Sequence, residues 1–212
     1  MGLLRIFDNL GGVKAAAALG RTDQNRASAE EHVADGIELA RREQLAEALA
    51  EFRRAAAKCP GMAEAHFNLG LTHARLKQPA EAIKAFNKAV SAEPDYADAY
   101  HQLGLTYFAM GKHVEAIGAY LKAVRVRPDC AEALHSLGEV YYSFGSDVEA
   151  LKAWRRAVSV RPDYAPTYYS LVVLHVERKE KERALELCDS LMQFDVAEAA
   201  KLYDYTVGAL GA

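Results

Sequence analysis

The sequence is poor in cysteine. Three cysteines, Cys59, Cys130 and Cys188, are spread over 212 residues. An odd and widely spaced set does not supply a disulfide framework, so we expect these residues to act as small apolar side chains in a reducing compartment. The predicted location is the cytoplasm.

Long apolar runs and runs of one charge are also missing. No stretch approaches the roughly 20 apolar residues of a membrane span. The apolar start of the chain is interrupted by Arg5 and Asp8, which argues against the core of a signal peptide. The formal net charge is −3 at pH 7 and Lys and Arg form no run, so nucleic acid is not expected as a partner.

Motifs that carry catalysis are absent as well. The sequence contains no phosphate-binding loop and no HExxH, GxSxG or CxxC motif. His66 and His73 lie near each other on one expected helix, but no cysteine or carboxylate joins them at the spacing of metal ligands. We therefore expect no enzyme activity, no catalytic residue, no metal site and no cofactor, and we expect both histidines to pack in the core.

What the sequence does contain is a period of 34 residues. The dipeptide Leu-Gly recurs with this step, ending at Gly70, Gly104 and Gly138. Three further sets share the step: the alanines Ala82, Ala116 and Ala150, the aromatic residues Phe86, Tyr120 and Trp154, and the prolines Pro60, Pro94, Pro128 and Pro162. Agreement of several positions on one period indicates a stack of similar structural units.

Each repeated position has a mechanical reason. Glycine and alanine are expected where two helices cross closely, and the aromatic residues fill the wider gaps between helices. Gly111 and Gly145 are expected in turns that end the first helix of a pair. The prolines end the second helix, and the aspartates that follow them are predicted to be N-caps of the next one. These are Asp95, Asp129 and Asp163.

The order of these residues resembles the tetratricopeptide-repeat pattern of an aromatic residue, Leu-Gly and Tyr, then Ala, an aromatic residue, Ala and Pro. The resemblance implies an all-α fold, a right-handed tetratricopeptide solenoid of helix-turn-helix repeats with a C-terminal capping helix. It divides the chain into an N-terminal amphipathic segment at 1–28, repeats over 29–198, and a capping helix and tail at 199–212. The five repeats are 29–62, 63–96, 97–130, 131–164 and 165–198. The last one departs from the pattern, with Val172 at the glycine position.

The resemblance also implies where a ligand binds. In similar proteins the first helix of each pair lines a concave groove and supplies most ligand contacts. The positions that correspond to those contacts give the predicted peptide-binding groove: Glu64, Phe67, Asn68, Leu71, Asp98, His101, Gln102, Leu105, Phe108, Glu132, His135, Glu139, Tyr142 and Tyr169.

The chemistry of this predicted groove narrows the kind of ligand. The family's carboxylate clamp grips the acidic C-terminus of a heat-shock chaperone with Lys, Arg and Asn. Asn68 fits one clamp position, but Asp98 and Gln102 stand where basic residues are required, so a clamp is not expected. An apolar and aromatic floor edged by carboxylates suits a helix or extended segment with an apolar stripe and basic flanks. Because His101 and His135 occupy equivalent places, binding is predicted to change between about pH 5.5 and 7.5.

The sequence thus predicts a protein-interaction adaptor or assembly scaffold that binds an apolar or basic peptide or helix. One alternative is a self-assembling structural protein that forms a homo-oligomer through residues 1–28. That segment carries a charge of +2, which leaves −5 for the rest of the chain, and Leu3, Leu4, Phe7 and Leu10 fall on one helical face. It could dock in its own groove, in a neighbour's groove or on a membrane, where two early basic residues give little attraction. An enzyme or metal site hidden in the groove is the remaining alternative.

Overall fold

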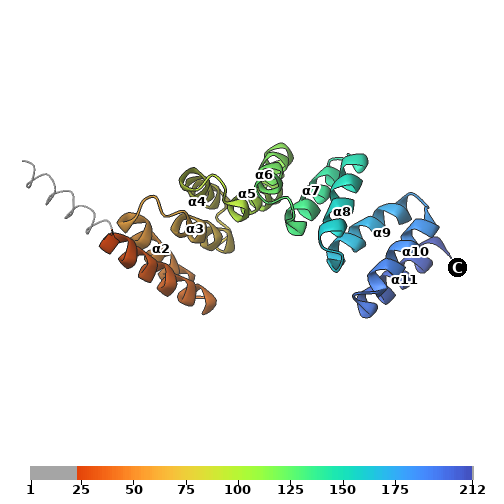
Figure 1. Cartoon of the computed structure of the whole chain (residues 1–212), viewed down its shortest axis with the longest axis horizontal. Helices are drawn as coiled ribbons and strands as arrows, with labels where there is room; N and C mark the ends of the chain where they lie inside the picture. Colours follow the sequence, from red (N-terminus) through yellow and green to blue (C-terminus); the bar gives the residue numbers. More distant parts are fainter. Residues whose placement is uncertain (1–22, 212) are drawn as a thin grey trace, which may run out of the picture. The chain divides into compact units, whose positions relative to one another are not determined.

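The structure, a computed structural model, describes residues 23–211. The predicted apolar face at Leu3, Leu4, Phe7 and Leu10 lies outside the described residues. Within residues 23–211 all regular structure is helical, and consecutive helices pack against each other in pairs (Figure 1). The predicted all-α stack of helix pairs with a C-terminal capping helix is confirmed.

The chain divides into two compact units, Met1–Pro94 and Asp95–Ala212. In the first unit, residues 23–41 are helical and are followed by α2 (Leu45–Lys58), α3 (Ala63–Arg75) and α4 (Pro79–Ala92). The second unit contains α5 (Ala97–Ala109), α6 (His113–Val126), α7 (Ala131–Ser143), α8 (Asp147–Val160), α9 (Ala165–Glu177), α10 (Lys181–Met192) and α11 (Val196–Leu210). The helix α11 packs against both α9 and α10 and covers the last pair.

Glycine permits the close crossing of the two helices in a pair. A Cβ atom added at Gly70 would lie 2.4 Å from the ring of Phe86, and one added at Gly138 would lie 2.3 Å from Trp154 Nε1. Gly36 and Gly104 meet the rings of Phe52 and Tyr120 in the same way. The aromatic side chains are almost completely buried, so the predicted role of the repeated glycines is confirmed.

The last pair solves the same packing problem with different residues. Val172 stands at the glycine position of α9, and Cys188 stands at the aromatic position of α10. Both are fully buried and belong to one apolar cluster with Leu191 and Leu202. In this pair the larger side chain stands on the first helix and the smaller one on the second, the reverse of the other pairs. Neither side chain is as large as the aromatic rings of those pairs.

The turn inside each pair contains one residue with positive φ. Gly111 and Gly145 have φ of 71° and 76°, which confirms their predicted role in ending the first helix. Glu43, Lys77 and Lys179 take the equivalent places with φ of 60°, 57° and 59°. A non-glycine residue in this region costs roughly 1–2 kcal/mol, so three of the turns carry strain that the two glycine turns avoid.

The predicted aspartate N-caps are wrong. The N-caps of α5, α7 and α9 are Tyr96, Cys130 and Tyr164, and no side chain caps these helices by a hydrogen bond. Each aspartate lies one residue too early in the turn that follows the proline. Asp195 does cap α11, because its carboxylate accepts a hydrogen bond of 3.0 Å from the amide of Glu198.

His66 and His73 are packed in the first unit as predicted. They are 7% and 8% exposed, and each forms one short hydrogen bond. His66 Nε2 lies 2.9 Å from the carbonyl oxygen of Pro60, and His73 Nδ1 lies 2.7 Å from Gln78 Oε1. Among residues 23–211 no helix is both long and apolar enough to cross a bilayer.

Candidate functional site

The predicted groove residues fall on the first helices of the pairs, in both units. In the first unit, α3 carries Glu64, Phe67, Asn68 and Leu71. Phe67 packs with its ring centroid 5.8 Å from that of Phe86, and the Asn68 side chain donates a 3.0 Å hydrogen bond to the Glu64 carbonyl of its own helix. The amide group of Asn68 is thus already bonded to the backbone of its own helix. Glu64 is the charged residue of this set, and it is exposed.

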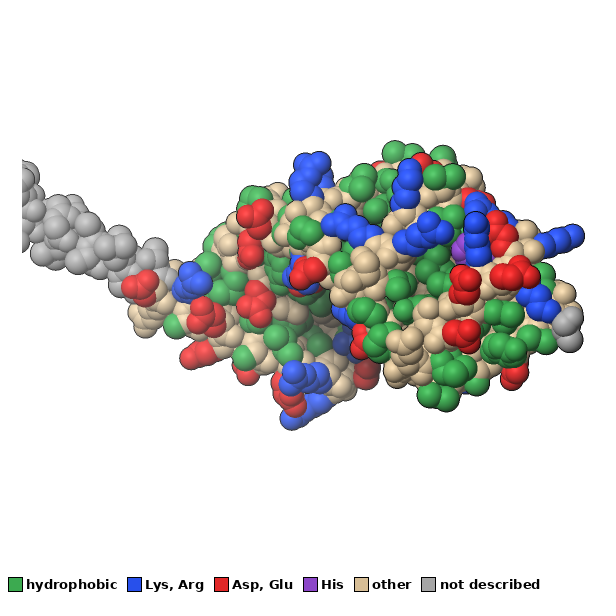
Figure 2. All heavy atoms as spheres, turned by 45° about the vertical axis from the view of Figure 1, so that its right-hand side comes forward, with side chains coloured by type: hydrophobic (Ala, Val, Ile, Leu, Met, Phe, Trp, Pro, Cys, Tyr) green, Lys and Arg blue, Asp and Glu red, His purple; other side chains and the backbone are tan. Residues whose placement is uncertain are grey.

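The other ten predicted residues lie in the second unit, on α5, α7 and α9. We call the surface made by these three helices the A-helix face. Leu105 is 38% exposed and Tyr169 is 53% exposed, whereas the remaining eight are half-buried. These eight are Asp98, His101, Gln102, Phe108, Glu132, His135, Glu139 and Tyr142. On the face drawn in Figure 2, hydrophobic side chains reach the surface between charged groups of both signs.

Two ion pairs at equivalent repeat positions neutralise part of the predicted acidic edge. Arg127 donates two hydrogen bonds to Asp98, of 2.9 and 3.0 Å, and Arg161 lies 2.6 Å from Glu132. The hydrogen bonds from Arg127 and Arg161 to these carboxylates raise the pKa of both guanidinium groups. Asp98 and Glu132 are therefore not free carboxylates, because each pairs with an arginine from the loop before the next first helix.

These two pairs also surround a small polar pocket. It has a volume of about 370 Å³ and is lined by both pairs together with His101, Asp129 and Cys130. The two ion pairs neutralise four of the five charged groups in its wall, and Asp129 leaves a net charge of −1.

The two histidines of the A-helix face connect neighbouring first helices. His101 Nε2 lies 3.1 Å from Ser136 Oγ, and His135 Nδ1 lies 3.4 Å from Thr167 Oγ1. Burial lowers the pKa of both imidazoles below the usual 6.5, although nearby carboxylates oppose the shift. Protonation of these rings therefore requires more acidic conditions than protonation of a free imidazole, and the pH dependence of binding stays a prediction.

A second group of carboxylates on the same face has no cation. Tyr142 donates a hydrogen bond of 2.5 Å to Glu177, and Ser170 donates one of 2.6 Å to Glu139. The hydrogen bond to Glu177 is the main reason that the pKa of Tyr142 rises to about 12, with contributions from burial and from the charge of Glu139. Within the described residues neither Glu139 nor Glu177 forms an ion pair. We call Glu139, Tyr142 and Glu177 the acidic aromatic cluster.

At the end of the A-helix face, α11 contributes an aromatic side chain. The ring centroid of Tyr205 lies 6.4 Å from that of Tyr169, and the residues are 41% and 53% exposed. The capping helix thus covers the last pair and also extends the aromatic surface at its edge.

Sequence reasoning missed several residues of this face. Arg127 and Arg161 are 34 residues apart, as are Asp98 and Glu132, and this shared step is a signal that could have paired them. Glu177 and Tyr205 carry no such signal, because their positions depend on how α9 and α11 pack. In residues 23–211 no three His, Cys, Asp or Glu side chains group as metal ligands.

Comparison with family models gives two matches that share one description. Both models are described as tetratricopeptide repeat, and they match residues 33–97 and 95–163. Between them they cover helices of both units. A search of curated proteins gave no match.

Solved structures with similar folds are numerous. The crystal structure of MamA has a TM-score of 0.70 and 23% identity, with 78% of this chain and 96% of that chain covered. PilF of Pseudomonas aeruginosa gives a TM-score of 0.75 and 19% identity, covering 89% and 85%. YrrB, described as a protein of this repeat type with an unusual peptide-binding site, has a TM-score of 0.65 and 22% identity, with 84% of this chain and 93% of that chain covered. At these identities the likeness concerns the fold.

Proposed function

Since the chain belongs to the tetratricopeptide-repeat family, we propose that it is a protein-interaction adaptor that binds a partner segment on the A-helix face. The segment is an apolar helix or extended peptide that carries a Lys or Arg side chain. Arrays of this kind present surfaces to other polypeptides, and YrrB, a protein of similar fold, is described as having a peptide-binding site.

The acidic aromatic cluster is the observation that carries this proposal. Glu177 accepts a hydrogen bond from Tyr142, Glu139 accepts one from Ser170, and no described cation forms an ion pair with either carboxylate. A Lys or Arg side chain of the partner would pair with one of these carboxylates near the aromatic ring, which attracts cations. Because Asp98 and Glu132 are already paired with arginines, Glu139 and Glu177 carry the proposed preference for a basic side chain.

Apolar contacts complete the proposed site. Leu105 is exposed on α5, and Phe108 and Val173 are half-buried on either side of α7. Burying apolar surface contributes about 25 cal/mol per Å², so side chains of the partner that cover these residues supply affinity while the cation supplies selectivity. The family's acid-binding clamp is not proposed, because Asp98 and Gln102 stand where its basic residues belong.

The experiment is a peptide array probed with the purified full chain. Apolar peptides that contain one Lys or Arg are compared with versions in which that residue is Gln or Glu. The Glu139→Gln/Glu177→Gln variant should bind the basic peptides at least about tenfold more weakly, or ~1.4 kcal/mol. Glu115→Gln on α6 is the matched control, because Glu115 is exposed on a second helix. Equal binding of acidic and basic peptides, or full affinity in the double variant, would reject the proposal.

Self-assembly through residues 1–28 stays a prediction, because residues 1–22 lie outside the described part of the chain. Deleting residues 1–28 and measuring the molecular mass over a range of protein concentrations tests this prediction. A mass that falls to that of one chain supports self-assembly, and an unchanged mass contradicts it.

A further inference from the structure

The first unit contains a hollow on the side of its second helices, lined by residues of α2, α3 and α4. Its volume is about 580 Å³. Leu69 and Ala85 contribute apolar surface, and three cations, Arg53, Lys84 and Lys88, line it as well. It shares no lining residue with the A-helix face, so it is a separate feature of the protein.

The charges of this hollow are not balanced. Glu81 is the one carboxylate in its lining, and it is paired with Lys84 at 2.8 Å. Arg53 and Lys88 are exposed, and neither forms a hydrogen bond or ion pair with a described residue. Two cations therefore remain available to an acidic ligand.

A buried histidine in the same wall lacks a partner on one side. The carbonyl oxygen of Pro60 can only accept, so His66 Nε2 at 2.9 Å must carry the hydrogen of that bond. His66 Nδ1 is buried and has no hydrogen-bond partner among the described residues, and the side chain is only 7% exposed. An unpaired polar atom of this kind is costly without a ligand or water.

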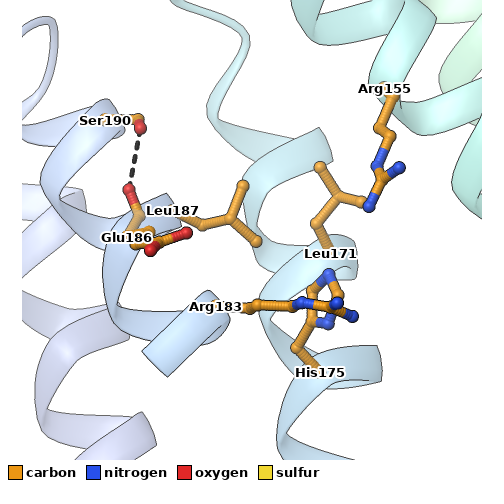
Figure 3. A pocket seen from close by; sticks show the side chains of 7 residues that line it. All are labelled: Arg155, Leu171, His175, Arg183, Glu186, Leu187 and Ser190. Carbon is orange, nitrogen blue, oxygen red and sulfur yellow. Dashed lines mark hydrogen bonds between the residues drawn. The ribbon is translucent and has the colours of Figure 1, made fainter. Parts of the chain in front are cut away.

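A histidine stands in the wall of this hollow where the next two pairs have a larger residue. His73 lies in its lining, whereas the equivalent residues of the next two pairs are Tyr107 and Tyr141, whose rings pack into the core. His175 is again a histidine, and a hollow of about 250 Å³ lies at the same place in the second unit (Figure 3).

The second hollow shares part of its lining with the first, although Glu186 and Ser190 stand where the first has Lys84 and Lys88. In Figure 3, Arg155 of α8 and Arg183 of α10 reach over Leu171 and His175 of α9 from opposite sides. Arg155 is equivalent in the repeat to Arg53, and Leu171 to Leu69, each 102 residues later. Arg155 has no ion pair within the described residues, whereas Arg183 lies 3.0 Å from Glu180. The same combination of apolar floor and unpaired arginine thus occurs twice.

We propose that the hollow between α2 and α4 is a second binding site, which takes an acidic segment of a partner protein. An apolar side chain of this segment lies on Leu69 and Ala85, and its flanking carboxylates pair with Arg53 and Lys88. The preference for acid is opposite to that of the A-helix face. The protein can therefore hold two different segments, one on each site.

The test uses the full chain and the synthetic peptide acetyl-Glu-Leu-Glu-Glu-Leu-Glu-amide as the probe. Backbone amide NMR shifts are followed during titration, beside a control peptide in which every Glu is Gln. The acidic peptide should shift amides of α2, α3 and α4, and the Gln peptide should not. Shifts confined to α5, α7 and α9, or equal shifts with both peptides, would overturn the proposal.

Variants separate this site from general charge attraction. Arg53→Glu/Lys88→Glu should weaken binding of the acidic peptide at least about tenfold. Lys58→Glu/Lys77→Glu changes the net charge by the same amount at exposed positions outside the hollow, and should change affinity less than about twofold. Equal losses in both variants, or complete displacement of the peptide by inorganic phosphate at equal concentration, would show a nonspecific anion surface and contradict the proposal. Because the A-helix face is untouched, failure here leaves the basic-peptide array result unaffected.

Discussion

Trp154 lies directly against Gly138, so closely that a single added Cβ atom would be 2.3 Å from the indole nitrogen. The indole also donates a 3.2 Å hydrogen bond to the carbonyl of His135 on the same first helix. The ring is completely buried and cannot turn aside without losing this bond. The spacing of α7 and α8 therefore depends on the absence of a side chain at residue 138.

Gly138→Ala should destabilise the protein by roughly 1–3 kcal/mol, because the overfilled crossing forces Trp154 or the helices to move. Gly118→Ala is the matched control. Gly118 lies inside α6 with nothing within 4 Å of an added Cβ, so alanine should stabilise by about 0.5–1 kcal/mol through helix propensity. Urea unfolding followed by circular dichroism measures both, and a Gly138→Ala variant as stable as wild type would contradict the packing argument.

Lys77→Gly and Lys179→Gly should each stabilise the protein by about 1 kcal/mol, because glycine removes the strain of positive φ in the turn. Both lysines are exposed, so little packing is lost. Lys112→Gly is the control, since Lys112 has φ of −88° in the equivalent turn of another pair and should show no gain. Thermal unfolding gives the order of the melting temperatures, and a lower melting temperature for Lys77→Gly than for Lys112→Gly would count against this explanation.

Acidification should lower the free energy of unfolding of the second unit, because His101 and His135 are buried there. Burial lowers the pKa of both rings in the folded protein below 6.5, while the unfolded chain keeps the usual value. Below pH 6.5 the unfolded state thus binds more protons, and stability falls as the pH drops toward the folded pKa values. Above pH 6.5 this contribution is constant. The His101→Gln/His135→Gln variant should show a smaller loss of unfolding free energy between pH 7.5 and 5.5, and an identical loss would refute the assignment.

Hydrogen exchange should be slowest over residues 97–164. Their turns contain Gly111 and Gly145 without backbone strain, and Tyr120 and Trp154 are fully buried in the pairs. Stability in repeat arrays is roughly a sum over units and their neighbours, so the regular central pairs should open least. Mass spectrometry of deuterium uptake resolves this, and slowest exchange in residues 165–211 would disprove it.

Much of the fold could be predicted because its determinants recur. Gly104 and Tyr120 are repeated as Gly138 and Trp154 at one constant step, and each pair alone specifies a close helix crossing. The N-caps of α5, α7 and α9 could not be placed, because a shift of one residue in an irregular turn changes which amide a side chain reaches. The ion pairs of the A-helix face could not be predicted for a related reason. Arg127 comes from a loop 29 residues after Asp98, and its side chain is brought there only by the packing of two pairs.

An array of equivalent helix pairs can gain or lose a unit by recombination within its gene, because one junction between helices resembles the next. Val172 and Cys188 restrict this at the last pair. A crossover between their two helices would join Val172 to an aromatic residue from another pair, or join a glycine to Cys188. The first product overfills the crossing and the second leaves a void. The packing of the fifth pair therefore favours its exchange as a whole, whereas the pairs that share the glycine and the aromatic ring can exchange single helices.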